Sequence, residues 1–161
     1  MVTINRFEEV PYERDLGAPA PYRGGVHHFS VGADLTHAVA FELEPGQAVC
    51  PYHYEYGHEL WAVVLEGQVT VRTPEGFQEL ATGDVMFAAR GTDGTHQLIN
   101  KSEGRVRILG FSNSGLGASF YPDSEKVGVW TPFEGEDFIG VRSTGVGYFH
   151  GEGDLHLMAD D

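Results

Sequence analysis

A tyrosine-rich stretch holds the residues of this chain whose types and spacing could bind a metal ion. Residues 51–59 read Pro-Tyr-His-Tyr-Glu-Tyr-Gly-His-Glu. In an extended strand, His53 and Glu55 project from one face and the intervening tyrosines from the other. Imidazole nitrogen and carboxylate oxygen bind divalent ions when no thiolate is offered. With Glu59 and the distant His96 as further candidates, the hypothesis is a site for one Fe, Mn, Ni or Zn ion.

The composition narrows the classes of partner. The chain has 161 residues and a mass of 17.6 kDa, which predicts one hydrophobic core. Its net charge of -14 repels phosphate backbones and anionic lipid, so we expect neither a nucleic-acid nor a membrane partner. A single cysteine, Cys50, excludes an intramolecular disulfide and a cysteine-rich zinc site. The start resembles no signal peptide, so a cytoplasmic location is predicted.

The elements that would position these side chains are short strands. Between residues 36 and 112, apolar stretches of four to eight residues alternate with turn signals, and none holds a helical period. This pattern predicts an all-β sandwich or closed barrel. The expected strands cover residues 36–43, 60–65, 69–72, 77–81, 85–89, 96–99 and 106–111.

The two ends differ from this central region. Residues 1–35 are rich in proline, glycine and charge, and are interpreted as an N-terminal wrapping segment with one or two strands. Residues 113–161 are rich in aromatic side chains, including Trp130, Phe133 and Phe138. This C-terminal extension is expected to pack on the barrel or on a neighbouring subunit.

Two segments resemble the paired motifs of the cupin superfamily. The first runs from Gly46 through His53 and Glu55 to Gly67, and the second runs from Gly83 to Asn100. Residues 121–124, Tyr-Pro-Asp-Ser, are similar to a segment of small single-domain cupins. The resemblance implies a cupin-type double-stranded β-helix, or jelly-roll, barrel over residues 36–112.

The resemblance also implies a ligand set. Cupins bind one metal through two histidines and a glutamate of the first motif and a histidine of the second. His53 and His96 occupy two of these positions, and Glu55 stands where the second histidine is usual. Counting forward from His53 places the glutamate at Glu59, whereas counting back from the closing glycine places Leu60 there. Strand alternation allows only one of these two to face the barrel interior.

Other residues near these motifs have ordinary interpretations. His58 is interpreted as a surface or rim histidine, and His37 as a core histidine or part of a pocket lining. Cys50 is interpreted as a small packing residue beside a proline.

Two function hypotheses follow. In the first, the chain is a cupin metalloprotein that acts on a small oxygen-bearing metabolite, as a dioxygenase, isomerase or related enzyme. In the second, it is a non-catalytic or degenerate cupin that binds a small metabolite or sugar, with the same residues forming a hydrogen-bonded cluster. A homodimer is expected in either case, because cupins commonly pair and the chain ends are aromatic.

Overall fold

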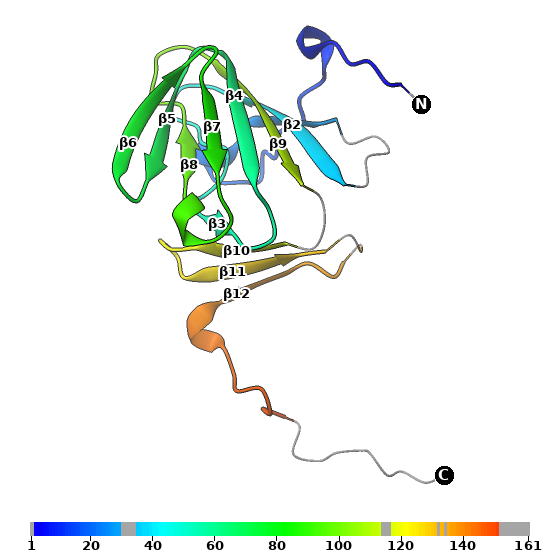
Figure 1. Cartoon of the computed structure of the whole chain (residues 1–161), viewed down its shortest axis with the longest axis vertical. Coiled ribbons are helices and arrows are strands. Elements are labelled where there is room, and N and C mark those ends of the chain that lie inside the picture. Colours follow the sequence, from blue (N-terminus) through cyan, green and yellow to red (C-terminus); the bar gives the residue numbers. More distant parts are fainter. Residues whose placement is uncertain (1, 30–34, 114–116, 132, 134, 152–161) are drawn as a thin grey trace.

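A computed structural model describes residues 2–29, 35–113, 117–131, 133 and 135–151 (Figure 1). The described residues form antiparallel sheets and short 3-10 turns, and contain no helix long and apolar enough to cross a membrane. The all-β prediction is therefore confirmed. The strands are β1 (Gly25–His28), β2 (Thr36–Leu43), β3 (Tyr54–Glu55), β4 (Leu60–Glu66), β5 (Gln68–Thr73), β6 (Gly76–Ala81), β7 (Val85–Ala88), β8 (Gln97–Ile99), β9 (Val106–Asn113), β10 (Gly117–Tyr121), β11 (Lys126–Trp130) and β12 (Phe138–Val141).

Two sheets form the barrel. One has the order β1-β2-β9-β4-β7 and the other the order β6-β5-β8. Apolar side chains from both sheets pack between them, because alternation along each strand turns one apolar row inward. The buried core consists of Leu43, Ala62, Val64, Val69, Val71, Leu98, Val106 and Ile108.

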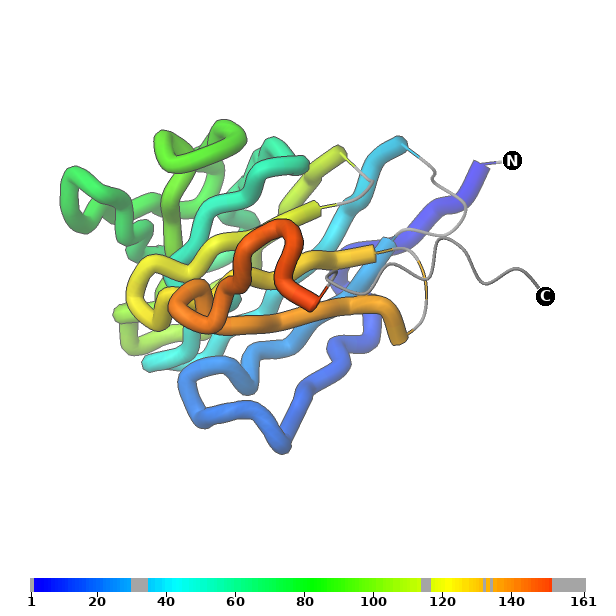
Figure 2. Tube along the Cα trace, turned by 90° about the horizontal axis from the view of Figure 1, so that it is seen from below, coloured from blue at the N-terminus to red at the C-terminus, as the bar shows by residue number. Residues whose placement is uncertain are grey.

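A third sheet, with the order β12-β11-β10-β3, is built mainly from the C-terminal part of the chain. Strand β10 pairs with β3, with Ser119 opposite Glu55 and Phe120 opposite Tyr54. Figures 1 and 2 show β10, β11 and β12 running across one end of the barrel. This pairing carries residues beyond 116 to the segment that holds His53 and Glu55.

The N-terminal arm lies against the outer edge of the five-stranded sheet. Glu13 forms an antiparallel bridge with Val26 of β1. Nearby, the Arg107 guanidinium donates to Glu42 at 3.0 Å and to Glu8 at 2.8 Å, which joins the arm to β2 and β9. The arm also reaches the segment that follows β2, because the carbonyl of Pro21 accepts a 2.7 Å hydrogen bond from the amide of Ala48.

The turn between β4 and β5 requires glycine. Gly67 has φ 82°, and a Cβ there would lie 2.5 Å from the carbonyl oxygen of Arg105. Glycine avoids both the strained conformation and the clash. A β-bulge between Val64 and Glu66 separates this turn from Leu60, so the pairing of β4 with β9 sets which side chains of β4 face inward.

Candidate functional site

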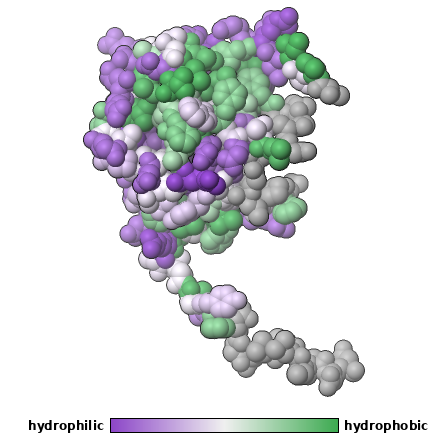
Figure 3. Space-filling view, in the orientation of Figure 1, coloured by the Kyte–Doolittle hydropathy of each residue, from purple (hydrophilic) through white to green (hydrophobic). Residues whose placement is uncertain are grey.

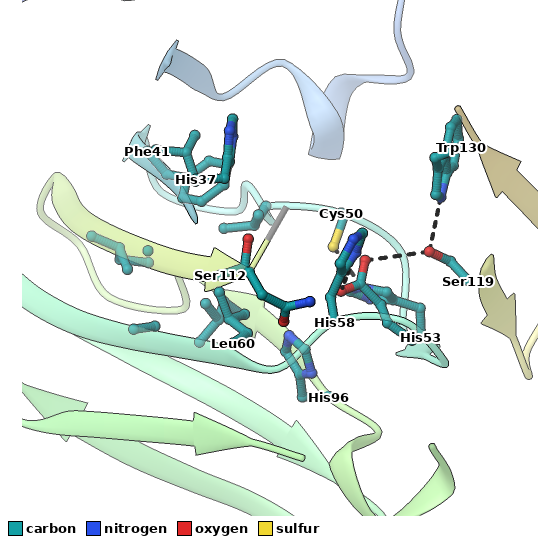
Figure 4. Close-up of a pocket in the computed structure, with 18 of the residues that line it drawn as sticks. His37, Phe41, Cys50, His53, His58, Leu60, His96, Ser112, Ser119 and Trp130 are labelled. Atoms are coloured by element: carbon teal, nitrogen blue, oxygen red, sulfur yellow. Dashed lines mark hydrogen bonds and ion pairs between the residues drawn. The ribbon is translucent and has the colours of Figure 1, made fainter. Parts of the chain in front are cut away.

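A cavity of about 500 Å³ lies between the barrel strands and the third sheet (Figure 4). Its apolar lining comes from barrel strands and includes Val39, Phe41, Leu98 and Ile108. Its polar lining comes largely from the segments around β3, β8 and β10. These polar residues are His53, Glu55, His58, His96, Ser119 and Tyr121.

His53 and His96 are brought together by paired backbone hydrogen bonds. The amide of His53 donates to the carbonyl of His96 at 3.1 Å, and the amide of His96 donates back at 2.9 Å. Their ring centroids lie 4.9 Å apart, and both residues are buried. Residues 43 positions apart in the chain thus line one cavity.

Backbone carbonyls orient both rings. Nδ1 of His53 lies 3.0 Å from the carbonyl oxygen of Pro51, and Nδ1 of His96 lies 2.8 Å from that of Gly94. A carbonyl oxygen only accepts, so each Nδ1 carries the hydrogen. In the neutral ring, Nε2 then keeps its lone pair, as in metal-ligating histidines held by an outer hydrogen bond.

Burial favours the neutral form of both rings. It lowers the pKa of His53, and it lowers the pKa of His96 from 6.5 to about 4, with the nearby His53 as a smaller cause. Burial also raises the pKa of the Cys50 thiol to about 12. Cys50 lines the cavity as a neutral thiol, which is close to the packing role expected of it.

Among the described residues, Glu55 is the one carboxylate that lines the cavity. Its oxygens lie 3.9 Å from Nε2 of His53 and 3.6 Å from Nδ1 of His58. The Ser119 hydroxyl donates a 3.3 Å hydrogen bond to Glu55 and accepts a 2.8 Å hydrogen bond from the Trp130 indole (Figure 4). The third sheet thus helps to hold Glu55.

The choice between Glu59 and Leu60 is made by strand register. Leu60 pairs with Ser112 and Ser112 pairs with His37, so all three share one face of the sheet, and all three line the cavity. Glu59 does not line the cavity, and its carboxylate lies 3.5 Å from the Arg90 guanidinium. The structure brings His53, Glu55 and His96 together, but not Glu59.

The side-chain types of His53, Glu55 and His96 suit a divalent ion, but the distance between His53 and Glu55 is longer than one ion requires. In the described part of the chain, no group of three or more His, Cys, Asp or Glu side chains is placed to hold a metal ion. The 3.9 Å between Nε2 of His53 and the nearest oxygen of Glu55 exceeds the roughly 3.4 Å expected between two ligands of a tetrahedral ion. The Glu55 side chain would therefore have to turn for both atoms to reach one ion.

Several lining residues lie outside the set predicted from sequence. His58 lines the cavity beside Glu55, three positions away, a spacing visible in the sequence. Gly117 of β10 lies directly over its ring, where a Cβ would lie 2.4 Å from Cε1 of His58. Ser119 and Trp130 carry no sequence signal, because only the pairing of β10 with β3 brings them here.

His37 also lines the cavity, as one of its two interpretations predicted. Its Nε2 lies 3.1 Å from Nδ1 of His28 on the neighbouring strand β1. Burial lowers the pKa of His37, with smaller contributions from His28 and His58. The imidazole of His37 thus adds a polar side chain from β2 to a cavity whose other polar side chains come largely from the segments around β3, β8 and β10.

Comparison with known structures supports the fold. A sugar phosphate isomerase from a cupin superfamily, from Silicibacter pomeroyi, superposes with a TM-score of 0.77 at 14% identity, covering 88% of this chain and 94% of that one. A putative sugar phosphate isomerase from Acidithiobacillus ferrooxidans gives a TM-score of 0.77 at 17% identity, covering 91% and 94%. The polyketide cyclase RemF from Streptomyces resistomycificus gives 0.59 at 21% identity, covering 70% and 80%. Likeness at these identities establishes the fold alone.

One of two sequence comparisons gives a match. No protein with a curated description matches this chain. The Cupin domain family model matches residues 39–111, a range that runs from β2 to β9 and contains His53, Glu55 and His96. Together with the jelly-roll architecture, this match identifies residues 39–111 as a cupin domain.

Proposed function

We propose that this cupin binds a small oxygen-bearing metabolite in its cavity, next to one divalent metal ion held by His53, Glu55 and His96. The ion would be Fe, Mn, Ni or Zn, and it would supply Lewis acidity to a bound oxygen. Glu59 leaves the proposed ligand set, because its side chain lies outside the cavity lining.

One observation carries the proposal. Two buried imidazoles from separate motifs share one cavity, and each donates Nδ1–H to a backbone carbonyl. Burial lowers the pKa of both, so their Nε2 lone pairs are available at neutral pH. Metal binding requires deprotonated nitrogen, and here the fold favours it without a metal.

Metal content of matched variants tests the ligand set. Protein is purified without added metal, dialysed against equal concentrations of the four ions, and analysed for bound metal. We expect near-stoichiometric metal in wild type and in Glu59→Gln, and a loss of about tenfold or more in affinity in Glu55→Gln. Wild type without bound metal, or equal losses in the two variants, would contradict the proposed ligand set.

A metal-free binding protein is the second candidate. It is favoured by Leu60 in the cavity lining, where an acidic ligand would otherwise stand, and by the wide spacing of His53 and Glu55. In this case, the same cavity binds a small metabolite or sugar through hydrogen bonds alone. Ligand binding that survives complete removal of metal by a chelator would favour this candidate.

A homodimer is also proposed, formed through the outer face of the five-stranded sheet. Trp61, Phe87 and Phe111 lie in one cross-strand row there and are between 45% and 52% exposed. Figure 3, drawn in the orientation of Figure 1, shows apolar surface over this side of the barrel. Such a row supports an interface with another sheet. Light scattering should give twice 17.6 kDa for wild type and a monomer for Trp61→Lys. A wild-type mass of 17.6 kDa would refute the dimer.

The cytoplasmic location expected from the sequence stays a prediction.

A further inference from the structure

The cavity has no lysine or arginine among its lining residues. All ten lysines and arginines of the chain lie within the described residues, and none of them lines the cavity. The residues outside the described ranges contain no lysine or arginine in their sequence, so they cannot supply one. A permanent side-chain cation is therefore missing from this binding site.

Several of the arginine side chains instead form ion pairs with carboxylates outside the cavity. Arg72 makes two hydrogen bonds to Asp123, at 2.6 and 2.9 Å. Arg107 is held by Glu42 and Glu8, and Arg90 lies beside Glu59. Moving such a guanidinium into the cavity would break an existing ion pair, so these arginines are not available to bind an anion there.

Among the described residues, the cavity lining offers one carboxylate, Glu55, and no lysine or arginine to balance it. A divalent ion bound beside one carboxylate and two neutral imidazoles would leave a single net positive charge. That charge still does not balance a dianionic phosphate ester. The described residues also contain no α-helix whose N-terminus could hold a phosphate.

We infer that the ligand is a compact molecule without a phosphate group, with an apolar face and oxygen atoms at one end, and that phosphorylated sugars are excluded. The inference rests on the proposed function, which makes this cavity the ligand site. Its apolar wall, with Val39, Phe41 and Ile108, would contact the carbon skeleton. Ser119 and Tyr121 on β10 would meet the oxygen atoms. The volume of about 500 Å³ suits a single small molecule.

The physical reason is the cost of removing a phosphate from water. Proteins bind phosphate dianions with bidentate arginine, lysine or several aligned backbone amides, because desolvation without such partners is unfavourable. The two most extensively superposed structures described above bear sugar phosphate isomerase names, which belong to those proteins. By its charge, the cavity of this chain fits a different class of ligand.

Ligand-observed NMR with matched probes tests this inference on the protein as purified. Catechol and cyclohexane-1,2-diol represent the uncharged class, and phenyl phosphate and ribose 5-phosphate represent the phosphorylated class. Ser112→Phe fills the cavity from β9, and Leu60→Trp does so from β4. The matched control is Ala81→Phe, since Ala81 is exposed at the end of β6 and does not line the cavity. Circular dichroism melting confirms that each variant is folded.

We expect the uncharged probes to bind wild type and Ala81→Phe at least about tenfold more tightly than the phosphorylated probes, and to lose binding in the filled variants. We also expect Ser112→Lys, which adds a cation at the cavity wall, to gain phenyl phosphate binding. If the phosphorylated probes bind wild type more tightly than the uncharged probes and lose binding in Ser112→Phe, this inference is overturned while the proposed site stands. If no probe binding responds to either filled variant, the proposed function fails, and the inference fails with it.

Discussion

Acid should destabilise the metal-stripped protein partly through His96. The pKa of His96 is lowered from 6.5 to about 4 by burial, so the unfolded chain takes up a proton before the folded chain does. The stability that depends on a neutral His96 is complete above pH 6.5 and is lost as the pH falls toward 4. At about 1.4 kcal/mol per pKa unit, lowering the pH from 7.5 to 4.5 should cost roughly 2 to 3 kcal/mol from this residue.

The test compares wild type with His96→Asn by urea unfolding in the presence of a chelator at both pH values. Asparagine does not titrate, and its amide can replace Nδ1–H as the donor to the Gly94 carbonyl. We expect wild type to lose roughly 2 to 3 kcal/mol more free energy of unfolding than the variant over this interval. His150→Asn, at an exposed position, is the control and should behave as wild type. An equal acid loss in wild type and His96→Asn would refute the reasoning.

Three further predictions concern single side chains. Asn100→Ala should lower the free energy of unfolding by about 2 to 4 kcal/mol in urea titrations, because this fully buried amide donates to two backbone carbonyls; a loss under 1 kcal/mol would contradict it. Leu60→Glu should raise zinc or manganese affinity about tenfold or more over Leu60→Gln, measured by calorimetry, since it adds a carboxylate to the cavity wall; equal affinities would count against the ligand set. Gly117→Ala should cost about 1 to 3 kcal/mol and shift the His58 ring resonances in NMR spectra, because the new methyl group would overlap the ring; unchanged stability and spectra would show that β10 does not pack there.

Much of the barrel could be predicted from local patterns. The expected strand over residues 36–43 coincides with β2, and the expected strand that starts at Leu60 coincides with the start of β4. Alternation with period two and glycine-containing turns are local properties, so they are readable without the fold. The approach of His53 to His96 was foreseen only through the resemblance to paired cupin motifs, and the structure places both in one cavity.

The sequence by itself determined the all-β class, the strand pattern and the types of donor that the site offers, because each depends on residues close together in the chain. The tertiary structure decided which of the candidate ligand side chains lie together in the cavity. Register between β4 and β9 turned Leu60 inward and left Glu59 outside. Pairing of β10 with β3 brought Ser119 beside Glu55 from 64 positions away. These outcomes depend on non-local pairing, in which a shift of one residue reverses the face of every side chain, so no local pattern could specify them.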